Sequence, residues 1–286
     1  MTNASNPISG PVVAQYFGLF NGVPKAHYDE IVATAPFDKC NLLITAFVHA
    51  VQNHGSADYV AAFTNWRDGD GRYPAKPGDM DTDRLTRLVE AARAKNPDIK
   101  ILISLGWGNN DAGNAAETPA AFAQSVANIV RAHDLDGIDI DYESTYVTPE
   151  AMLELAQHLR RALDGLGSSR QMIMTITPAQ LSGLSKEVLD CFTFTTPQAY
   201  DHGGNGTQVA PYADMLGSYD TILFGLNSEG YIGQSDDPKP RAAGAKAHGA
   251  PGVLAWRLDN DSVDRATGYP TFATGLEMWA LMHDGD

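Results

Sequence analysis

Short apolar runs rich in β-branched residues recur along the chain and alternate with segments of helical spacing. The runs predict eight strands, at residues 12–17, 42–48, 99–105, 137–142, 172–177, 192–199, 221–226 and 252–258. Three segments between them, 82–95, 119–133 and 149–166, carry apolar residues along one helical stripe. Strands that alternate with helices indicate a parallel sheet, and eight such units predict a closed (β/α)8 barrel.

The pattern also predicts where elements begin and where a long loop lies. Thr118-Pro119 and Thr148-Pro149 each place an N-cap residue before a proline, which suits the first position of a helix. Residues 49–81 are rich in Gly, Asp and Pro and predict a loop at the catalytic rim of the barrel. We find no internal repeat or linker, so we expect one α/β domain, a single (β/α)8 barrel over residues 1–286.

Composition narrows the class of protein. The chain has 286 residues, of which 43% are hydrophobic, enough to bury a large core. The net charge of -15 argues against nucleic acid or an anionic membrane as a partner, and we expect a monomer.

The first residues lack the features of a signal peptide, and no apolar run reaches transmembrane length, so localisation stays open. Cys40 and Cys191 are the two cysteines, which excludes a disulfide framework, and the histidines show no metal-ligand spacing.

The segment from Asp136 to Glu143 carries the candidate chemistry. In a strand, residues two apart share a face, so Asp139, Asp141 and Glu143 point one way and the apolar residues between them point the other. Adjacent carboxylates push their pKa values apart, which keeps one acid protonated beside ionised neighbours. The alternatives are a solvated strand face or ligands for a divalent cation.

This segment resembles the DGxDxDxE signature of glycoside hydrolase family 18, which includes chitinases and endo-β-N-acetylglucosaminidases. Other segments that resemble strands of that family are Tyr16 with its strand, Ala46-Phe47, Gln198-Ala199-Tyr200-Asp201 and the run from Gly252 to Trp256. One segment departs from the family pattern Ser-x-Gly-Gly, since it reads Ser104-Leu105-Gly106-Trp107-Gly108.

The resemblance implies a retaining, substrate-assisted mechanism, an exception to the usual pair of carboxylates. Glu143 would protonate the glycosidic oxygen, and the N-acetyl oxygen of the substrate would attack the anomeric carbon. Asp141 would orient the acetamido group, Asp139 would share a proton with Asp141, and Tyr200 would hold the acetamido oxygen. No cofactor or metal is implied.

Further residues take binding or structural roles by the same resemblance. Trp256 would form the floor of the sugar site. The remaining assignments are Tyr16, Gln198 and Trp107 to substrate binding, and Asp136, Gly137, Ser104 and Gly106 to the structural motif. Packing in the barrel or its loops is the alternative for Tyr16, Gln198 and Trp107, and Trp279 is expected in the core.

The implied substrate is an oligo- or polysaccharide containing N-acetylglucosamine, cleaved at β-1,4 linkages. About 25 residues separate the seventh predicted strand from the eighth, too few for the α+β domain that some family members insert there. An open cleft and endo-type cleavage of chitin would follow. The alternatives are an endo-β-N-acetylglucosaminidase acting on N-glycans, a sugar-binding lectin, or a metal-dependent barrel enzyme. The resemblance implies secretion.

Overall fold

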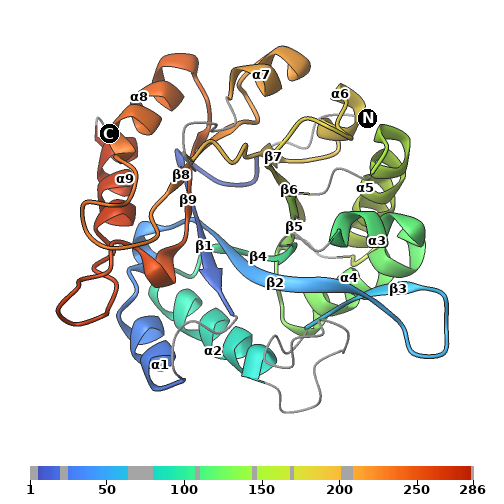
Figure 1. The fold of residues 1–286 in the computed structure, drawn as a ribbon, viewed down its shortest axis with the longest axis horizontal. Helices are drawn as coiled ribbons and strands as arrows, with labels where there is room; N and C mark the ends of the chain where they lie inside the picture. The colour runs from blue at the N-terminus through green and yellow to red at the C-terminus, as the bar shows by residue number, and fades with distance from the viewer. Residues whose placement is uncertain are drawn as a thin grey trace.

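The sheet curves into a barrel with helices around it (Figure 1). The computed structural model describes residues 6–19, 25–63, 80–106, 110–143, 147–167, 171–200 and 209–284. Within them, the wall consists of β1 (Val12–Gly18), β2 (Leu42–Gln52), β4 (Lys100–Leu105), β5 (Gly137–Tyr142), β6 (Ile173–Pro178), β7 (Phe194–Thr195), β8 (Leu223–Asn227) and β9 (Gly252–Trp256).

The strands are parallel and follow the order β7-β6-β5-β4-β2-β1-β9-β8. A parallel bridge between Thr195 in β7 and Ile222 beside β8 completes the ring. Another strand, β3 (Tyr59–Ala62), pairs antiparallel with the end of β2. This is the predicted (β/α)8 barrel, and its parallel strands bring their carboxyl ends to one rim.

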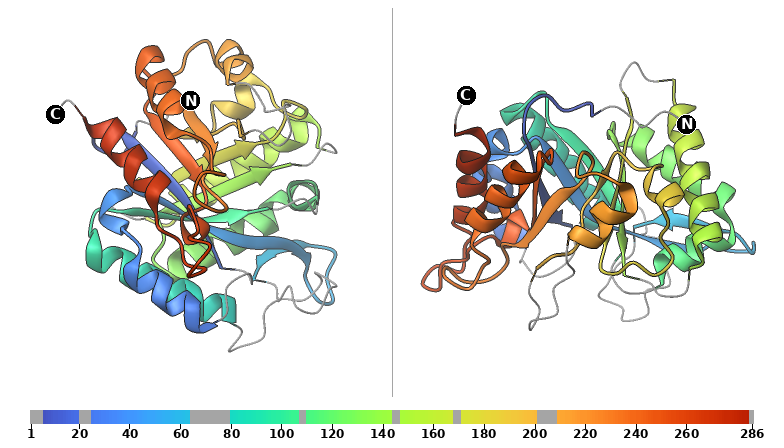
Figure 2. Two further views of the ribbon diagram at one scale, coloured as in Figure 1. Left: turned by 60° about the vertical axis from the view of Figure 1, so that its left-hand side comes forward. Right: turned by 90° about the horizontal axis from the view of Figure 1, so that it is seen from above.

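Helices cover the outside of this barrel. Figure 2 shows α8 and α9 on the opposite side of the strands from α4 and α5. The described helices are α1 (Lys25–Thr34), α2 (Met80–Lys95), α3 (Asp111–Glu117), α4 (Pro119–Ala132), α5 (Pro149–Asp164), α6 (Lys186–Leu189), α7 (Ala210–Leu216), α8 (Pro238–His248) and α9 (Ala273–His283), with short 3₁₀ turns η1 (Phe37–Lys39) and η3 (Leu258–Asn260).

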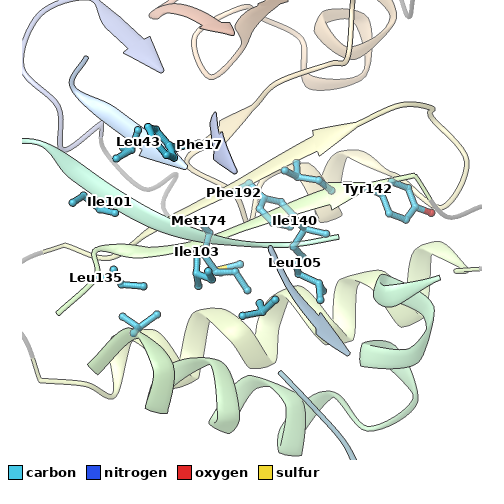
Figure 3. Close-up of a cluster of buried hydrophobic side chains, with 14 of the residues drawn as sticks. Phe17, Leu43, Ile101, Ile103, Leu105, Leu135, Ile140, Tyr142, Met174 and Phe192 are labelled. Carbon is cyan, nitrogen blue, oxygen red and sulfur yellow. The ribbon is translucent and has the colours of Figure 1, made fainter. Parts of the chain in front are cut away.

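Two apolar layers stabilise the barrel, one outside the strands and one inside. Outward side chains such as Ile103, Ile140 and Met174 are fully buried between strands and helices (Figure 3). Inside the ring, residues such as Leu42 and Leu254 form a second cluster. Each such side chain contributes about 1.5–3 kcal/mol on burial. This inner cluster lines part of the barrel interior, and buried polar side chains such as Asp139 and Thr175 occupy another part of it.

The strand boundaries correct three expectations. The sixth predicted strand, 192–199, is regular only at Phe194–Thr195, because Pro197 has no N–H to donate to a neighbouring strand. The eighth ends at Trp256, and the chain then enters η3. The predicted loop 49–81 is wrong at its start, since β2 continues to Gln52 and β3 returns along it. Residues 64–79 lie outside the described part of the chain.

The two predicted helix caps differ in outcome. The Thr148 hydroxyl accepts a hydrogen bond from the Ala151 N–H and caps α5 as expected. Thr118 does not cap α4, because its hydroxyl accepts the N–H of Tyr59 at 2.7 Å. That contact ties β3 to the start of α4, so tertiary pairing replaces the local cap.

The segment between β8 and β9 is described in full, and it holds α8 with short connections rather than an inserted α+β domain. Cys40 and Cys191 are both free thiols. Within the described residues, no helix combines the length and apolar character needed to span a membrane.

Candidate active site

The acidic strand β5 separates its side chains as the alternation predicts. Ile138, Ile140 and Tyr142 pack into the outer apolar layer. Asp139 and Asp141 are buried on the other face, within the ring, and Glu143 follows directly after the strand and is half-buried. The three carboxyl groups therefore rise from the barrel interior toward the rim.

Asp139, the deepest of these acids, is surrounded by hydroxyl groups. Its Oδ2 accepts hydrogen bonds from Tyr16 and Ser104, each at 2.6 Å. Its Oδ1 accepts from Thr175 at 2.6 Å and Thr177 at 3.1 Å. Burial raises the pKa of Asp139, and the hydroxyl donors oppose that rise. The net effect is a pKa for Asp139 above that of an ordinary aspartate.

Gln198 links the two acids nearer the rim. Its Nε2 donates to Asp141 Oδ1 at 2.7 Å and lies 3.2 Å from Glu143 Oε1. The same nitrogen lies 3.3 Å from the backbone oxygen of Thr177. One amide thus brings both carboxyl groups within hydrogen-bond distance of a single atom. The irregular chain after β7 places the Gln198 side chain beside these two acids.

Tyr200, two residues further on, is also buried. Burial raises its pKa well above the ordinary value, and the charges of Asp141, Glu143, Asp139 and Glu229 raise it further. The phenol therefore stays protonated and can donate a hydrogen bond. Asp201, the next residue of the same sequence pattern, lies outside the described residues.

Two glycines allow the acidic strand to fit its neighbours. A Cβ on Gly106 would lie 2.5 Å from Asp141 Cβ and 2.8 Å from Asp141 O. A Cβ on Gly137 would lie 1.8 Å from Ile173 O, and its φ of 151° also disfavours other residues. Gly106 therefore gives Asp141 its space, while Gly137 allows β5 and β6 to approach.

Asp136 lies at the opposite end of β5 from Glu143. Its Oδ2 accepts the Ile101 N–H at 3.0 Å and lies 3.3 Å from the Arg93 guanidinium. These contacts join β4, β5 and α2 away from the other acids.

Trp256 lies at the carboxyl end of β9, at the same rim of the parallel barrel as the acids. The Tyr16 ring meets it edge-on at 5.1 Å, and the Phe47 ring stacks on it at 5.9 Å. Its indole Nε1 donates to Glu229 Oε2 at 2.9 Å. These three contacts together hold the partly exposed indole ring in place.

Sequence reasoning missed two acids at the rim. Glu229 follows β8 by two residues, so its place after a predicted strand was the available signal. Asp111, at the start of α3, contacts His49 Nδ1 at 2.9 Å and accepts the Ala50 N–H. Its partner lies 62 positions away in sequence, and no local pattern indicates that pairing.

Other expectations fall outside the site or outside the described residues. Trp107 lies in a segment that the structure does not describe. Trp279 is partly buried rather than fully in the core, and its ring stacks on His283 at 3.8 Å. The described residues contain no group of three His, Cys, Asp or Glu side chains placed to hold a metal ion.

The family model for glycosyl hydrolases family 18 matches residues 12–234, and the chain belongs to this family. Chitinase B of Serratia marcescens is 39% identical over 82 residues, which cover 24% of this chain and 16% of that protein. This match therefore spans under a fifth of the length of that relative.

Solved structures share the barrel at low sequence identity. A family 18 chitinase from the chitin utilization locus of Flavobacterium johnsoniae superposes with a TM-score of 0.67 at 18% identity, covering 95% of this chain and 94% of that one. A chitinase-like agglutinin from Robinia pseudoacacia gives 0.68 at 14% identity, covering 94% and 99%. These likenesses concern the fold.

Proposed function

We propose that this protein is an endo-chitinase that hydrolyses β-1,4 linkages between N-acetylglucosamine units with retention of configuration. The observation that carries the proposal is the Gln198 amide within hydrogen-bond distance of both Asp141 and Glu143, above a buried Asp139. Membership of family 18 and the likeness to Chitinase B of Serratia marcescens support the substrate class.

In the first step, Glu143 gives its proton to the glycosidic oxygen as the bond to the anomeric carbon breaks. The N-acetyl carbonyl oxygen of the same sugar forms a new bond to that carbon, giving an oxazolinium ion. In the second step, Glu143 takes a proton from water as the water oxygen attacks the anomeric carbon, and the bond from that carbon to the N-acetyl oxygen breaks to restore the acetamido group. Two inversions restore the original configuration. Half-burial at the rim suits Glu143 to this exchange with substrate and water.

The deeper carboxyl groups control charge in this proposal. Asp141 accepts the acetamido N–H and stabilises the positive charge that develops on the oxazolinium ring. Asp139 holds a proton that it exchanges with Asp141, and its raised pKa supports this role. When the shared proton is on Asp139, Asp141 is ionised and can balance the positive charge of the oxazolinium ring.

Binding residues orient the sugar against these acids. Tyr200 donates its hydroxyl to the acetamido oxygen, and Trp256 offers its face to the pyranose ring. Tyr16 holds Asp139 and the edge of Trp256 in place. Gln198 holds Asp141 until the acetamido group takes that position. Trp107 is proposed for the cleft lining by resemblance alone.

The short connection between β8 and β9 supports endo-type action on a polysaccharide. The segment 228–251 contains α8 and no additional domain, so it builds no high wall beside Trp256. We therefore propose an open cleft in which a chain can bind across the rim and be cut internally. Catalysis in this scheme uses the protein's own carboxyl groups and the substrate, and requires one protomer.

The test is mass spectrometry of products after incubation with chitohexaose and an N-glycopeptide together, with Glu143→Gln as the matched control. The proposal predicts internal cleavage of chitohexaose, abolished by the substitution. Release of a glycan that leaves one N-acetylglucosamine on the peptide would instead establish an endo-β-N-acetylglucosaminidase. Binding without cleavage would indicate a lectin, as in the agglutinin of the same fold.

A further inference from the structure

Glu229 is a partly exposed acid in the loop that follows β8, with both of its carboxylate oxygens engaged. Oε2 accepts the Trp256 indole N–H at 2.9 Å. Oε1 accepts the Asn260 side-chain N–H at 2.7 Å and lies 3.5 Å from Arg257 Nε. The carboxylate therefore connects the side chains of Trp256, Arg257 and Asn260, which follow one another closely in the chain.

The backbone around Glu229 is also tied to Trp256. The N–H groups of Ser228 and Glu229 both donate to Trp256 O, at 2.6 and 3.1 Å. The Glu229 N–H also lies 2.9 Å from Asn227 Oδ1, and an antiparallel bridge joins Glu229 to Asp261. This arrangement holds the loop after β8 against the end of β9. The Glu229 carboxylate is consequently held in place as an acceptor, and the Trp256 indole N–H points toward it.

The hydrogen bond to Glu229 defines the rotation of the Trp256 ring. An indole has one N–H donor, so an acceptor at that edge selects one orientation of the ring plane. Tyr16 and Phe47 restrict the ring from other sides at 5.1 and 5.9 Å between centroids. The Arg257 guanidinium also lies over the ring, 5.8 Å from its centroid. A planar platform must keep the face that meets the sugar parallel to the pyranose ring, and a small rotation would reduce that contact.

We infer that Glu229 is a positioning residue that fixes the Trp256 indole as the platform for a pyranose ring. The inference rests on the proposed function and deepens it, since it assigns a further residue to recognition of the same sugar. Glu229 therefore acts through Trp256, and its effect should depend on the indole N–H.

The experiment is a double-mutant cycle on chitohexaose hydrolysis with Glu229→Ala, Trp256→Phe and the double variant. Glu229→Ala is expected to lower kcat/KM on the order of tenfold, the factor of one charge-assisted hydrogen bond. In the Trp256→Phe background, which lacks the N–H, the same change should cost less than about twofold, because residues acting as one unit are not additive. Equal losses in both backgrounds would overturn the inference.

Two further variants separate positioning from a loss of folding. Glu229→Gln keeps an oxygen that can accept the indole N–H and should stay within about threefold of wild type. Glu277→Ala, at a partly exposed position on α9 where the carboxylate pairs with Lys239 of α8, is the matched control and should leave kcat/KM unchanged. Glu229→Gln losing as much activity as Glu229→Ala would contradict the role as an acceptor for Trp256.

A readout without turnover distinguishes failure of this inference from failure of the proposed function. The Trp256 indole N–H resonance of ¹⁵N-labelled protein is assigned by its absence in Trp256→Phe. Glu229→Ala should shift it upfield and speed its exchange with water, and Glu229→Gln should restore slow exchange. An unchanged resonance would refute the contact itself. A wild-type protein that cleaves neither glycan would reject the proposed function, whatever the resonance shows.

Discussion

Two buried aspartates of one motif, Asp136 and Asp139, lie in different surroundings. Asp136 meets a backbone N–H and the Arg93 guanidinium at the closed end of β5. Asp139 accepts hydrogen bonds from four hydroxyl groups inside the barrel. Hydroxyl groups can donate to a carboxylate or accept from a carboxylic acid, so the surroundings of Asp139 tolerate both of its forms. In the proposed mechanism the partners, rather than the residue type, distinguish Asp136 as a structural acid from Asp139 as a functional one.

The largest expected effect comes from Asp139→Asn. It removes a titratable group while keeping the shape of the side chain, so kcat/KM should fall by about 10²–10³, the usual cost of losing electrostatic control of a developing charge. The midpoint of thermal unfolding should not fall, because asparagine keeps the shape of the side chain and carries no charge that burial would penalise. Steady-state kinetics with a thermal melt checks both. Retained activity together with lower stability would make Asp139 a second structural acid.

Gly106→Ala tests the space next to Asp141. The added methyl group would lie 2.5 Å from Asp141 Cβ, so the side chain or β5 must shift. We expect kcat/KM to fall about tenfold or more, because a displacement of catalytic groups by an ångström is costly. Overpacking should also reduce the free energy of unfolding by about 1–3 kcal/mol. Kinetics and urea denaturation measure these two effects, and an unchanged kcat/KM would show that Asp141 needs no such space.

Asp136→Ala should show the reverse of the Asp139 result. It leaves the Ile101 N–H and Arg93 without this acceptor, and we expect the free energy of unfolding to fall by about 2–4 kcal/mol. Activity per folded molecule should remain within about twofold, since the side chain lies away from the rim. Urea denaturation and active-site titration check the prediction. A hundredfold loss in the folded fraction would place Asp136 in the catalytic network.

The smallest expected effect is a pH dependence of stability due to Asp139. Its pKa in the folded state is raised above the ordinary value of 3.8, so the folded protein binds this proton more tightly than the unfolded chain. Its contribution to stability is therefore present below pH 3.8 and is lost as pH rises through the raised pKa. The stability of Asp139→Asn relative to wild type should increase across that window. Denaturation at several pH values measures the difference, and a constant difference would contradict the raised pKa.

Much of the fold and part of the site follow from the sequence. Alternation in β5 correctly predicts that Asp139 and Asp141 face inward, because strand periodicity is a local property. The hydroxyl groups around Asp139 come from β1, β4 and β6, and the Tyr16 contact joins residues 123 positions apart. Such a cluster depends on barrel closure and stagger, which local patterns do not specify.

The missed partners show the same limit. Glu229 and Trp256 meet because β8 and β9 are neighbours in the barrel, with 27 positions between them in sequence. The place of Glu229 after the seventh predicted strand and of Trp256 near the end of the eighth could have indicated a shared rim but not a hydrogen bond. Likewise, β7 ends before Pro197, and the irregular backbone that follows places the Gln198 amide within hydrogen-bond distance of both acids. Strand periodicity cannot predict such an irregular segment.

The most direct test of substrate-assisted retention is the anomeric configuration of the first products from chitohexaose, observed by ¹H NMR before mutarotation. The wild-type protein should release new reducing ends in the β configuration, and Glu143→Gln should release none. Products that first appear in the α configuration would contradict attack by the N-acetyl oxygen. Cleavage that persists in Glu143→Gln would contradict the assignment of Glu143 as the acid.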